Sequence, residues 1–245
     1  MKIWNGDRHL TKIEDHKIVS ESEWLEAHKQ FLIKEKEFTR LRDQINQQRR
    51  NLPWKSVDKE YAFLGPDGKQ TLPELFDGKS QLIVYHFMFD PNWEAACPHC
   101  SFWADNFNGI ISHLNQRDVT MIAVSRAPYN KIDAYKKRMG WDFKWVSSSD
   151  TDFNFDYHVS FTEKELEKKE AFYNFTIQDL DSPEREGVSV FYKDSDGRVF
   201  HTYSTYARGI DMLNTAYNYL DLVPKGRDEN GNGQFWVRRH DEYDR

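Results

Sequence analysis

The amino-terminal part of the chain has apolar positions at helical spacing. Between residues 20 and 51 no Gly or Pro interrupts a charged segment, and Ser20 with Glu23 fits a capping box at its start. Leu52-Pro53 ends the predicted helix. The apolar positions recur every three, four or seven residues, so they share one side of this helix. They are Trp24, Ala27, Phe31, Phe38, Leu41 and Ile45.

This apolar stripe has two interpretations. The helix packs on the core of its own chain, or it forms a coiled-coil-like contact in a homodimer. Packing on the core is favoured, because a sustained seam needs about three or four unbroken heptads. Lys34 interrupts the stripe. A homodimer through the N-terminal helix is the second interpretation.

Beyond about residue 61, strand and helix patterns alternate. Continuously apolar runs are typical of strands buried on both faces. The order strand, helix, strand, helix predicts parallel strands joined by right-handed crossovers. The turn at 194–197 (DSDG) predicts a hairpin. The expected strands are 81–89, 119–125, 188–192 and 199–203, with a weaker one at 141–146, and the expected helices are 97–114, 128–139 and 209–220.

Three regions follow from this pattern. Residues 1–60 are an N-terminal helical arm, residues 61–223 are an α/β domain, and residues 224–245, rich in Gly, Asn and charge, are a C-terminal arm. A polar insertion at about 150–187 interrupts the domain and contains a charged helical stretch at 162–171. The expected fold class is α/β, with a central mixed sheet and flanking helices.

Composition narrows the functional classes. Aromatic residues make up 15% of the 245 residues, so we expect an aromatic core. The net charge of −6 gives no general attraction for nucleic acid or anionic lipid. Residues 1–10 lack the apolar region of a secretory signal, and the longest apolar run is far shorter than the roughly 20 residues of a membrane span. We therefore expect a cytoplasmic protein without a membrane or nucleic-acid partner.

The two cysteines carry the candidate chemistry. Both lie in the motif Cys97-Pro98-His99-Cys100, between the most apolar strand and an aromatic helix. The two-residue gap at a helix start brings the sulfurs within disulfide reach, and free helix N–H groups favour a thiolate at Cys97. A protonated His99 would lower the thiol pKa further. A cytosolic CxxC after a strand is typical of a redox pair.

Zinc binding and inert thiols are the alternatives to a redox pair. A structural zinc site usually needs four Cys or His ligands, and the chain has no second CxxC. His86 and His113 are the histidines that would complete such a set, but His86 lies inside a strand and is more simply a satisfied core histidine. No metal and no cofactor are expected.

Other residues have weaker claims to the site. Trp93 and Glu94 precede Cys97 on the same loop, so they would touch a substrate or tune the thiol. Tyr206 and Arg208 follow the hairpin in a group of polar aromatic residues. We expect them to contribute to the site only if the arms bring this end of the hairpin to the motif.

The sequence resembles the DUF899 family of thioredoxin-like proteins, whose biochemical role is undetermined. The resemblance covers nearly the whole chain. It implies a thioredoxin-like fold of the peroxiredoxin and TlpA-like branch, with Cys97 as nucleophile and Cys100 as resolving thiol. The CPHC tetrapeptide is similar to that of DsbA-type oxidants. The stretches that carry the resemblance are EWLEAHK, KEKEFTRLRDQ, GPDGKQTLPELFDGKSQLIVYHF, WEAACPHCSFWADNFNGI, VTMIAVSRAP, RMGWDFKWVSS, VSVFYKDSDGRVFHTYSTYARG and VRRHDEY.

Two departures from related folds limit what the resemblance implies. A thioredoxin has a cis-proline before its third central strand, whereas here that slot holds Gly187 or Val188 and Pro183 lies too far upstream. A peroxiredoxin-type site needs a Thr three residues before the reactive Cys, where this chain has Glu94. Substrate docking by backbone contact and peroxidase activity are therefore less favoured.

Three functional hypotheses result. The first is thiol-disulfide exchange at Cys97 and Cys100 on a disulfide-containing protein or a small thiol substrate, with reduction the expected direction in a reducing cytosol. The second is a thiol peroxidase. The third is a non-catalytic redox-sensing or partner-binding module, in which the CxxC switches the N-terminal helix. With no third cysteine in the chain, the electron donor must be another molecule.

Overall fold

The computed structural model describes residues 13–229 and 231–244 of the chain. Two compact units divide it: the first comprises Met1–Leu52 with Leu220–Asp228, and the second comprises Pro53–Tyr219 with Glu229–Arg245. The first unit contains a 3₁₀ turn, η1 (Ile13–Asp15), and the long helix α1 (Glu21–Arg50). The predicted capping box is confirmed, because Glu23 N donates to Ser20 Oγ at 3.3 Å and Ser20 N donates to Glu23 Oε2 at 3.0 Å.

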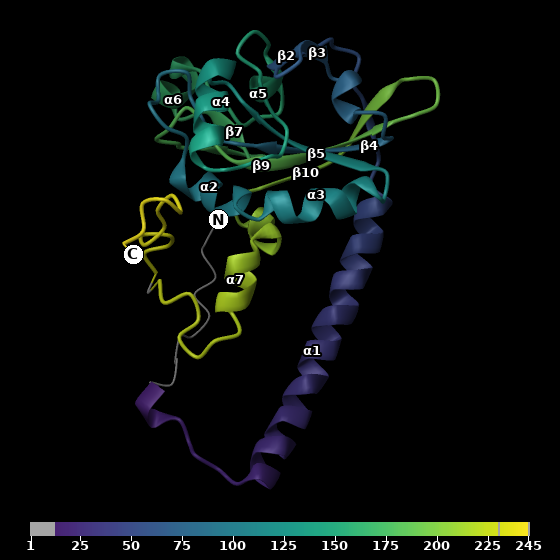
Figure 1. The fold of residues 1–245 in the computed structure, drawn as a ribbon. Coiled ribbons are helices and arrows are strands. Elements are labelled where there is room, and N and C mark those ends of the chain that lie inside the picture. Colours follow the sequence, from purple (N-terminus) through teal and green to yellow (C-terminus); the bar gives the residue numbers. More distant parts are fainter. Residues whose placement is uncertain (1–12, 230, 245) are drawn as a thin grey trace. The chain divides into compact units, whose positions relative to one another are not determined.

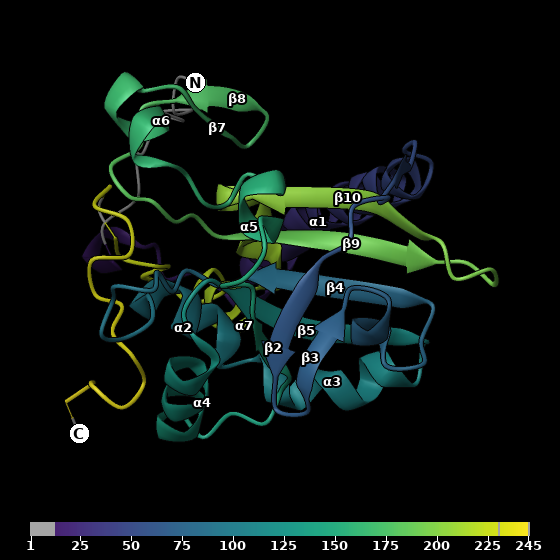
Figure 2. The same ribbon diagram turned by 90° about the horizontal axis from the view of Figure 1, so that it is seen from above.

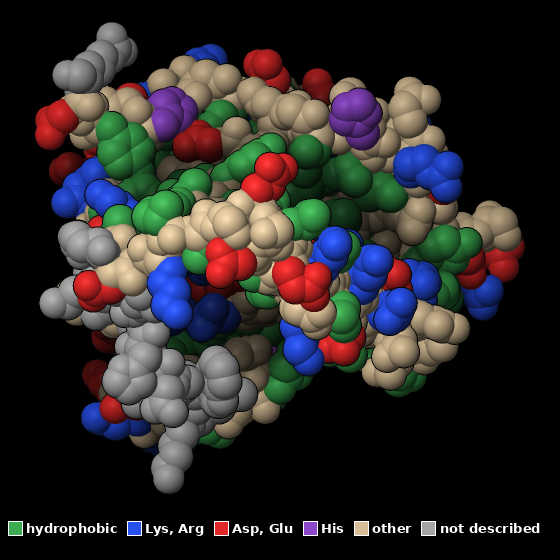
Figure 3. Space-filling model, turned by 90° about the horizontal axis from the view of Figure 1, so that it is seen from below, with side chains coloured by type: hydrophobic (Ala, Val, Ile, Leu, Met, Phe, Trp, Pro, Cys, Tyr) green, Lys and Arg blue, Asp and Glu red, His purple; other side chains and the backbone are tan. Residues whose placement is uncertain are grey.

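The apolar stripe of α1 is exposed. The helix buries none of its residues, and Trp24, Phe31 and Phe38 are 53%, 60% and 65% exposed. Figure 3 shows one face of the molecule, on which exposed hydrophobic side chains lie among charged residues of both signs. The described residues of its own unit give this stripe no cover, so the core-packing and homodimer interpretations both stay predictions.

The described residues of the second unit form an eight-stranded mixed sheet in the order β1-β10-β9-β4-β5-β6-β2-β3 (Figures 1 and 2). The strand β4 pairs in parallel with β5 and antiparallel with β9, and β9 pairs antiparallel with β10. This central order and these directions are those of the thioredoxin-like fold, as expected. The strands are β1 (Lys55–Ser56), β2 (Ala62–Gly65), β3 (Gly68–Thr71), β4 (Gln81–His86), β5 (Val119–Ser125), β6 (Trp145–Ser147), β9 (Gly187–Lys193) and β10 (Val199–Tyr206).

Helices cover both faces of the sheet. In Figure 1, α2 and α3 run below the central strands, while α5 and the β2–β3 hairpin lie above them. Alternation along β4 explains this, because Tyr85 packs on Phe107 of α3 and the next residue, His86, packs on Phe153 of α5. The helices of this unit include η2 (Glu74–Phe76), α2 (Pro98–Ala104), α3 (Phe107–Asn115), α4 (Tyr129–Arg138), α5 (Phe153–Asp156), α6 (Glu163–Lys168), η3 (Ala207–Leu213) and α7 (Thr215–Leu220).

Three expected elements differ from the structure. The single helix predicted over 97–114 is two helices, because Asn106 Nδ2 donates to Trp103 O at 3.2 Å and competes with the helical hydrogen bonds. The helix predicted over 209–220 is the 3₁₀ helix η3 followed by α7. The helical stretch predicted over 162–171 stops at Lys168, since Lys169 adopts a left-handed conformation with φ 58°.

The insertion at 150–187 contains more regular structure than we expected. Besides α5 and α6 it forms a second, two-stranded sheet, β7 (Ala171–Tyr173) with β8 (Thr176–Gln178). Figure 2 shows this β7–β8 hairpin on the β10 side of the main sheet. The core itself is aromatic as predicted, with Trp145, Tyr85 and Phe63 among its largest fully buried side chains. None of the described helices is both long enough and apolar enough to cross a membrane.

Candidate functional site

The two cysteines lie at the start of α2, directly after the loop that follows β4. Cys97 precedes Pro98, the first residue of α2, and Cys100 lies one turn farther along. Both thiols are free and nearly buried, with Cys97 9% and Cys100 2% exposed. The backbone of Met88 holds both: Cys97 N donates to Met88 O at 3.1 Å, and Met88 N donates to Cys100 Sγ at 3.5 Å.

The surroundings separate the roles of the two thiols. A hydrogen bond from Cys100 and the neighbouring imidazole of His99 hold the pKa of Cys97 well below its usual range, although burial opposes this. Burial raises the pKa of Cys100 well above its usual range, and the negative charge of Cys97 raises it further. The hydrogen bond to Cys97 also raises the pKa of His99. The surroundings therefore favour ionisation of Cys97 over ionisation of Cys100.

Glu186 is a residue of this site that the sequence did not reveal. It immediately precedes Gly187, the first residue of β9, which pairs with His86 at the end of β4. Burial raises the pKa of Glu186, and the charge of Cys97 raises it further. The charge of Glu186 in turn contributes to the raised pKa of Cys100. The carboxyl group therefore interacts electrostatically with both thiols.

Two tyrosines complete the interior of the site. Tyr173, from the β7–β8 hairpin, donates its hydroxyl hydrogen to Glu186 O at 2.9 Å and receives a hydrogen bond from Ala207 N at 2.9 Å. The buried hydroxyl of Tyr85 has no partner of normal hydrogen-bond geometry among the described residues. Burial raises the pKa of Tyr85, and the nearby Cys100 raises it further. Tyr173 thus fixes Glu186, while Tyr85 lies beside the resolving thiol.

The C-terminal arm, here residues 229–244, is bonded to the backbone around Cys97. Arg239 Nη2 donates to Ala96 O at 2.8 Å, and Arg239 Nε lies 3.0 Å from Tyr135 Oη. Tyr135 Oη shares a hydrogen bond with Ser101 Oγ at 2.8 Å, and Ser101 Oγ donates to Cys97 O at 2.9 Å. One network therefore binds the carbonyl groups of both Ala96 and Cys97.

Further contacts hold the arm against α2. The backbone of Gln234 accepts a hydrogen bond from His99, which helps to raise the pKa of His99. The rings of Trp236 and Phe102 meet edge to face at 5.3 Å. The arm thus contacts residues on both sides of Cys97. In the sequence, the string VRRHDEY marks this part of the arm, because it carries part of the family resemblance.

Not every predicted site residue reaches the thiols. Trp93 N donates to Asp90 O at 3.0 Å, and Glu94 is exposed on the same loop. Tyr206 points to the opposite face of the sheet, where its hydroxyl donates to Tyr157 O at 3.1 Å. Arg208 is exposed and forms an ion pair of 3.3 Å with an aspartate one turn on. The structure brings Pro98 and His99 to Cys97 and Cys100, but places Tyr206 elsewhere.

Gly187 and Val188, the two positions expected at the cis-proline slot of thioredoxins, are the first residues of β9. A Cβ at Gly187 would lie 2.5 Å from Tyr206 Cδ1, closer than real Cβ contacts allow, so the ring of Tyr206 excludes any side chain at this position. His86, one of the two histidines considered for zinc, instead bonds Ser189 Oγ through Nε2 at 2.8 Å. Within the described residues, no three His, Cys, Asp or Glu side chains gather as a metal site requires.

A buried ion network, also missed from the sequence, supports the loop before the motif. Arg126 Nη2 pairs with Asp90 Oδ2 at 2.7 Å, and Arg126 Nε pairs with Glu184 Oε1 at 2.6 Å. Glu184 Oε2 accepts a hydrogen bond from Ser160 Oγ at 2.9 Å. Burial raises the pKa of Glu184 to about 7. The network joins the loop after β4 to the insertion.

The fold and the cysteine pair define a thioredoxin-like protein with a CxxC dithiol. More particularly, the chain belongs to the family described as "Bacterial protein of unknown function (DUF899)", whose model matches residues 13–243. This confirms the family predicted from the sequence. No curated protein matches the chain.

Solved structures similar to this chain include two peroxiredoxin-type proteins. Peroxidoxin BcpB from Mycobacterium tuberculosis is 12% identical, with 66% of this chain and 93% of that chain covered and a TM-score of 0.45. Peroxiredoxin Q from Xanthomonas campestris is 16% identical, with 72% of this chain and 99% of that chain covered and a TM-score of 0.47.

Proposed function

We propose that the protein is a thiol-disulfide oxidoreductase that uses Cys97 and Cys100. The observation that carries this proposal is the position of two free thiols on the first turn of α2, with Cys97 at its N-terminal end and Cys100 one turn farther along. The surroundings lower the pKa of Cys97 and raise that of Cys100. The thiolate, not the thiol, attacks a disulfide. Cys97 is thus prepared for attack while Cys100 keeps its proton until the second step.

The reaction proceeds in two exchanges. Cys97 Sγ attacks one sulfur of a substrate disulfide, forms a mixed disulfide and releases the first thiolate. Cys100 then loses its proton and attacks Cys97 Sγ, which releases the second thiolate and leaves a Cys97–Cys100 disulfide. Two electrons pass from the protein to the substrate. Glu186, which interacts electrostatically with both thiols, is the proposed acceptor of the Cys100 proton in the second exchange.

The surroundings of Cys97 favour a small disulfide as substrate. The side chain is only 9% exposed, and the C-terminal arm is bonded to Ala96 and His99 on either side of it. A folded protein would have to displace this arm before its disulfide reached Cys97. Both cysteines take part in the reaction, so a thiol from another molecule regenerates the dithiol.

Stoichiometry with a chromogenic disulfide, 5,5′-dithiobis(2-nitrobenzoate), tests the mechanism. The parent should release about two thionitrobenzoate ions and form an internal disulfide, detected as the loss of two hydrogens by mass spectrometry. The Cys100→Ser variant should release about one ion and retain a mixed disulfide on Cys97. The Cys97→Ser variant should react slowly. Equal rates for Cys97→Ser and the parent would show that Cys97 is not the nucleophile.

Two further arms of this experiment address the other hypotheses. Hydrogen peroxide replaces the disulfide in the first, and faster oxidation of Cys97 by peroxide than by the disulfide would favour a thiol peroxidase. The second compares the mass of the reduced and oxidised protein by light scattering. A change in oligomeric state without turnover of any disulfide would favour a redox-sensing module.

A further inference from the structure

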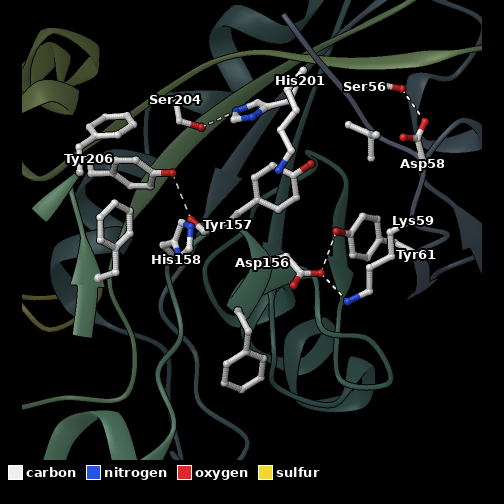
Figure 4. Close-up of a pocket in the computed structure, with 15 residues that line it drawn as sticks. Ser56, Asp58, Lys59, Tyr61, Asp156, Tyr157, His158, His201, Ser204 and Tyr206 are labelled. Atoms are coloured by element: carbon white, nitrogen blue, oxygen red, sulfur yellow. Dashed lines mark hydrogen bonds and ion pairs between the residues drawn. The ribbon is translucent and has the colours of Figure 1, made fainter. Parts of the chain in front are cut away.

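A cavity of about 670 Å³ lies in the second unit, apart from the thiol pair. Residues of β1, α5, the β7–β8 turn and β10 line it. Figure 4 labels Ser56 of β1, Asp156 of α5 and His201 of β10 among them. It lies on the His86 face of the sheet, whereas Cys100 lies on the opposite, Tyr85 face. Its volume is within the range of about 300–1,000 Å³ that is usual for small-molecule sites.

One aromatic residue of the cavity lining, Phe175, has an energetically unfavourable backbone conformation. Asn174 and Phe175 form the two-residue β7–β8 turn with φ 50° and 62°, the positive values of a type I′ turn, in which glycine is favoured at the second position. A bulky residue at positive φ is an outlier. Phe175 is nevertheless 69% exposed, and its ring lies 5.6 Å from that of Tyr206. His158, also in the lining, has φ 55°.

Apart from its contact with Tyr206, the ring of Phe175 stays mostly in solvent, so burial offsets little of this strain. Strained residues gather at binding sites, where the strained conformation aims a side chain at a ligand. The rest of the wall is aromatic as well, so a flat ligand would find ring faces on several sides. The aromatic lining residues are Tyr61, Phe155, Tyr157, Phe172, Phe175 and Tyr206.

Two polar residues of the lining, His201 and Ser204, begin a chain of hydrogen-bonded side chains. His201 Nε2 lies 3.0 Å from Tyr203 O and 2.7 Å from Ser204 Oγ. A carbonyl oxygen only accepts, so Nε2 carries the hydrogen. Ser204 Oγ lies 2.8 Å from Ser189 Oγ, and Ser189 Oγ lies 2.8 Å from His86 Nε2. Hydrogen bonds thus join two polar residues of the cavity wall, His201 and Ser204, to the sheet behind them.

One positive charge of the wall has no acidic partner among the described residues. Lys55, from β1, is close enough to His158 and His201 to lower the pKa of both, in addition to the effect of their burial. The two carboxylates of the lining are already engaged with neighbours. Asp156 pairs with Lys59 at 2.6 Å, and Asp58 accepts a hydrogen bond from Ser56 at 2.5 Å.

We propose that this cavity binds a flat aromatic acid, whose ring packs against Phe175 and Tyr157 and whose carboxylate pairs with Lys55. An aromatic body fits the aromatic wall. An anionic group supplies the partner that Lys55 lacks. The proposal is independent of the thiol chemistry, since the cavity and the cysteines lie on opposite faces of the sheet.

Titration of the full chain with 2-naphthoate tests the proposal. Amide resonances of the lining residues should shift together, and the neutral analogue 2-naphthamide should bind about tenfold more weakly because it lacks the charge. The Lys55→Met variant should lose about tenfold in naphthoate affinity. The matched control is Lys69→Met, an exposed lysine of β3 outside the lining, which should bind as the parent does.

The Phe175→Gly variant separates binding from folding. Glycine suits the strained position, so the thermal midpoint should stay the same or rise while naphthoate affinity falls. The Cys97→Ser/Cys100→Ser variant should keep the parent affinity, whatever the outcome of the disulfide assays. The proposal is wrong if naphthoate shifts no lining resonance at millimolar concentration, or if Lys55→Met or Phe175→Gly binds it as tightly as the parent.

Discussion

The contact between Arg239 and Ala96 gives a sharp test of the C-terminal arm. Ala96 is fully buried, and its carbonyl oxygen accepts from Arg239 Nη2 at 2.8 Å and from Arg239 Nε at 3.2 Å. The Arg239→Gln substitution removes the charge and shortens the side chain, so neither donor reaches Ala96 O. The arm then loses its anchor beside Cys97.

The size of the effect follows from the two lost hydrogen bonds. A hydrogen bond from a charged donor is worth about 1.5–3 kcal/mol, and the two share one acceptor, so we take about 3 kcal/mol for the contact. At about 1.4 kcal/mol for each factor of ten, release of the arm becomes about 100-fold more frequent. A reagent too bulky to reach Cys97 under the docked arm should therefore label it up to about 100-fold faster.

The assay compares labelling rates of Cys97 in a Cys100→Ser background. A fluorescein maleimide reports release of the arm, and iodoacetamide, which is small, reports the intrinsic reactivity of the thiolate. Arg238→Gln is the matched control, because the Arg238 side chain donates to Phe235 O and Val237 O, which both lie within the arm. Equal maleimide rates in Arg239→Gln, Arg238→Gln and the parent would refute the idea that the arm limits access.

Three other substitutions address single interactions. His99→Gln removes the imidazole that stabilises the Cys97 thiolate. The reduction potential of the Cys97–Cys100 pair should therefore become more negative by about 30 mV for each unit by which the pKa of Cys97 rises. A redox titration that gives the parent's potential would exclude this role of His99. Burial raises the pKa of Glu184 from 4.5 to about 7, so the folded protein holds a proton that the unfolded chain releases. Relative to Glu184→Gln, the parent should lose about 3 kcal/mol of its free energy of unfolding as pH rises from below 4.5 to above 7. Urea unfolding of both proteins at pH 4 and pH 8 measures this loss. If the difference in unfolding free energy between the two proteins is the same at both pH values, the prediction is wrong. Gly187→Ala places a Cβ 2.5 Å from Tyr206 and should cost about 1–3 kcal/mol in the same unfolding assay, whereas Gly109→Ala, with no atom within 4 Å of its Cβ, should cost nothing.

The site residues that are neighbours in the sequence were predictable from it, whereas the residue that comes from a distant segment was not. Cys97 and Cys100 are neighbours on one helical turn, so their spacing alone brings them together. Glu186 comes near them only because β9 pairs with β4, where Gly187 lies opposite His86. Such pairing between distant segments leaves no local signal. The sequence marked this place solely through the absence of the expected proline.

The fold shows the same division. The capping box of Ser20 and Glu23 is local, and the structure contains it. The break between α2 and α3 depends on the side chain of Asn106, which bonds the preceding turn instead of continuing the helix. The β7–β8 hairpin was missed because its turn residues, Asn174 and Phe175, lack the glycine that usually indicates a two-residue turn. The missed turn is the one that belongs to the proposed ligand cavity.

The pairing of β4 with β9 positions both sites at once. Tyr85 and its partner Val188 share the face of the sheet that carries the thiols, and Glu186, just before β9, interacts electrostatically with Cys97. Ser189 faces the other way, where it bonds His86 below the cavity. A slip of one residue in this register would turn Ser189 away from His86 and shift Glu186 relative to Cys97. The same strand pair therefore positions the proposed proton acceptor of the thiol site and the hydrogen-bonded residues behind the proposed ligand cavity, on opposite faces of one sheet.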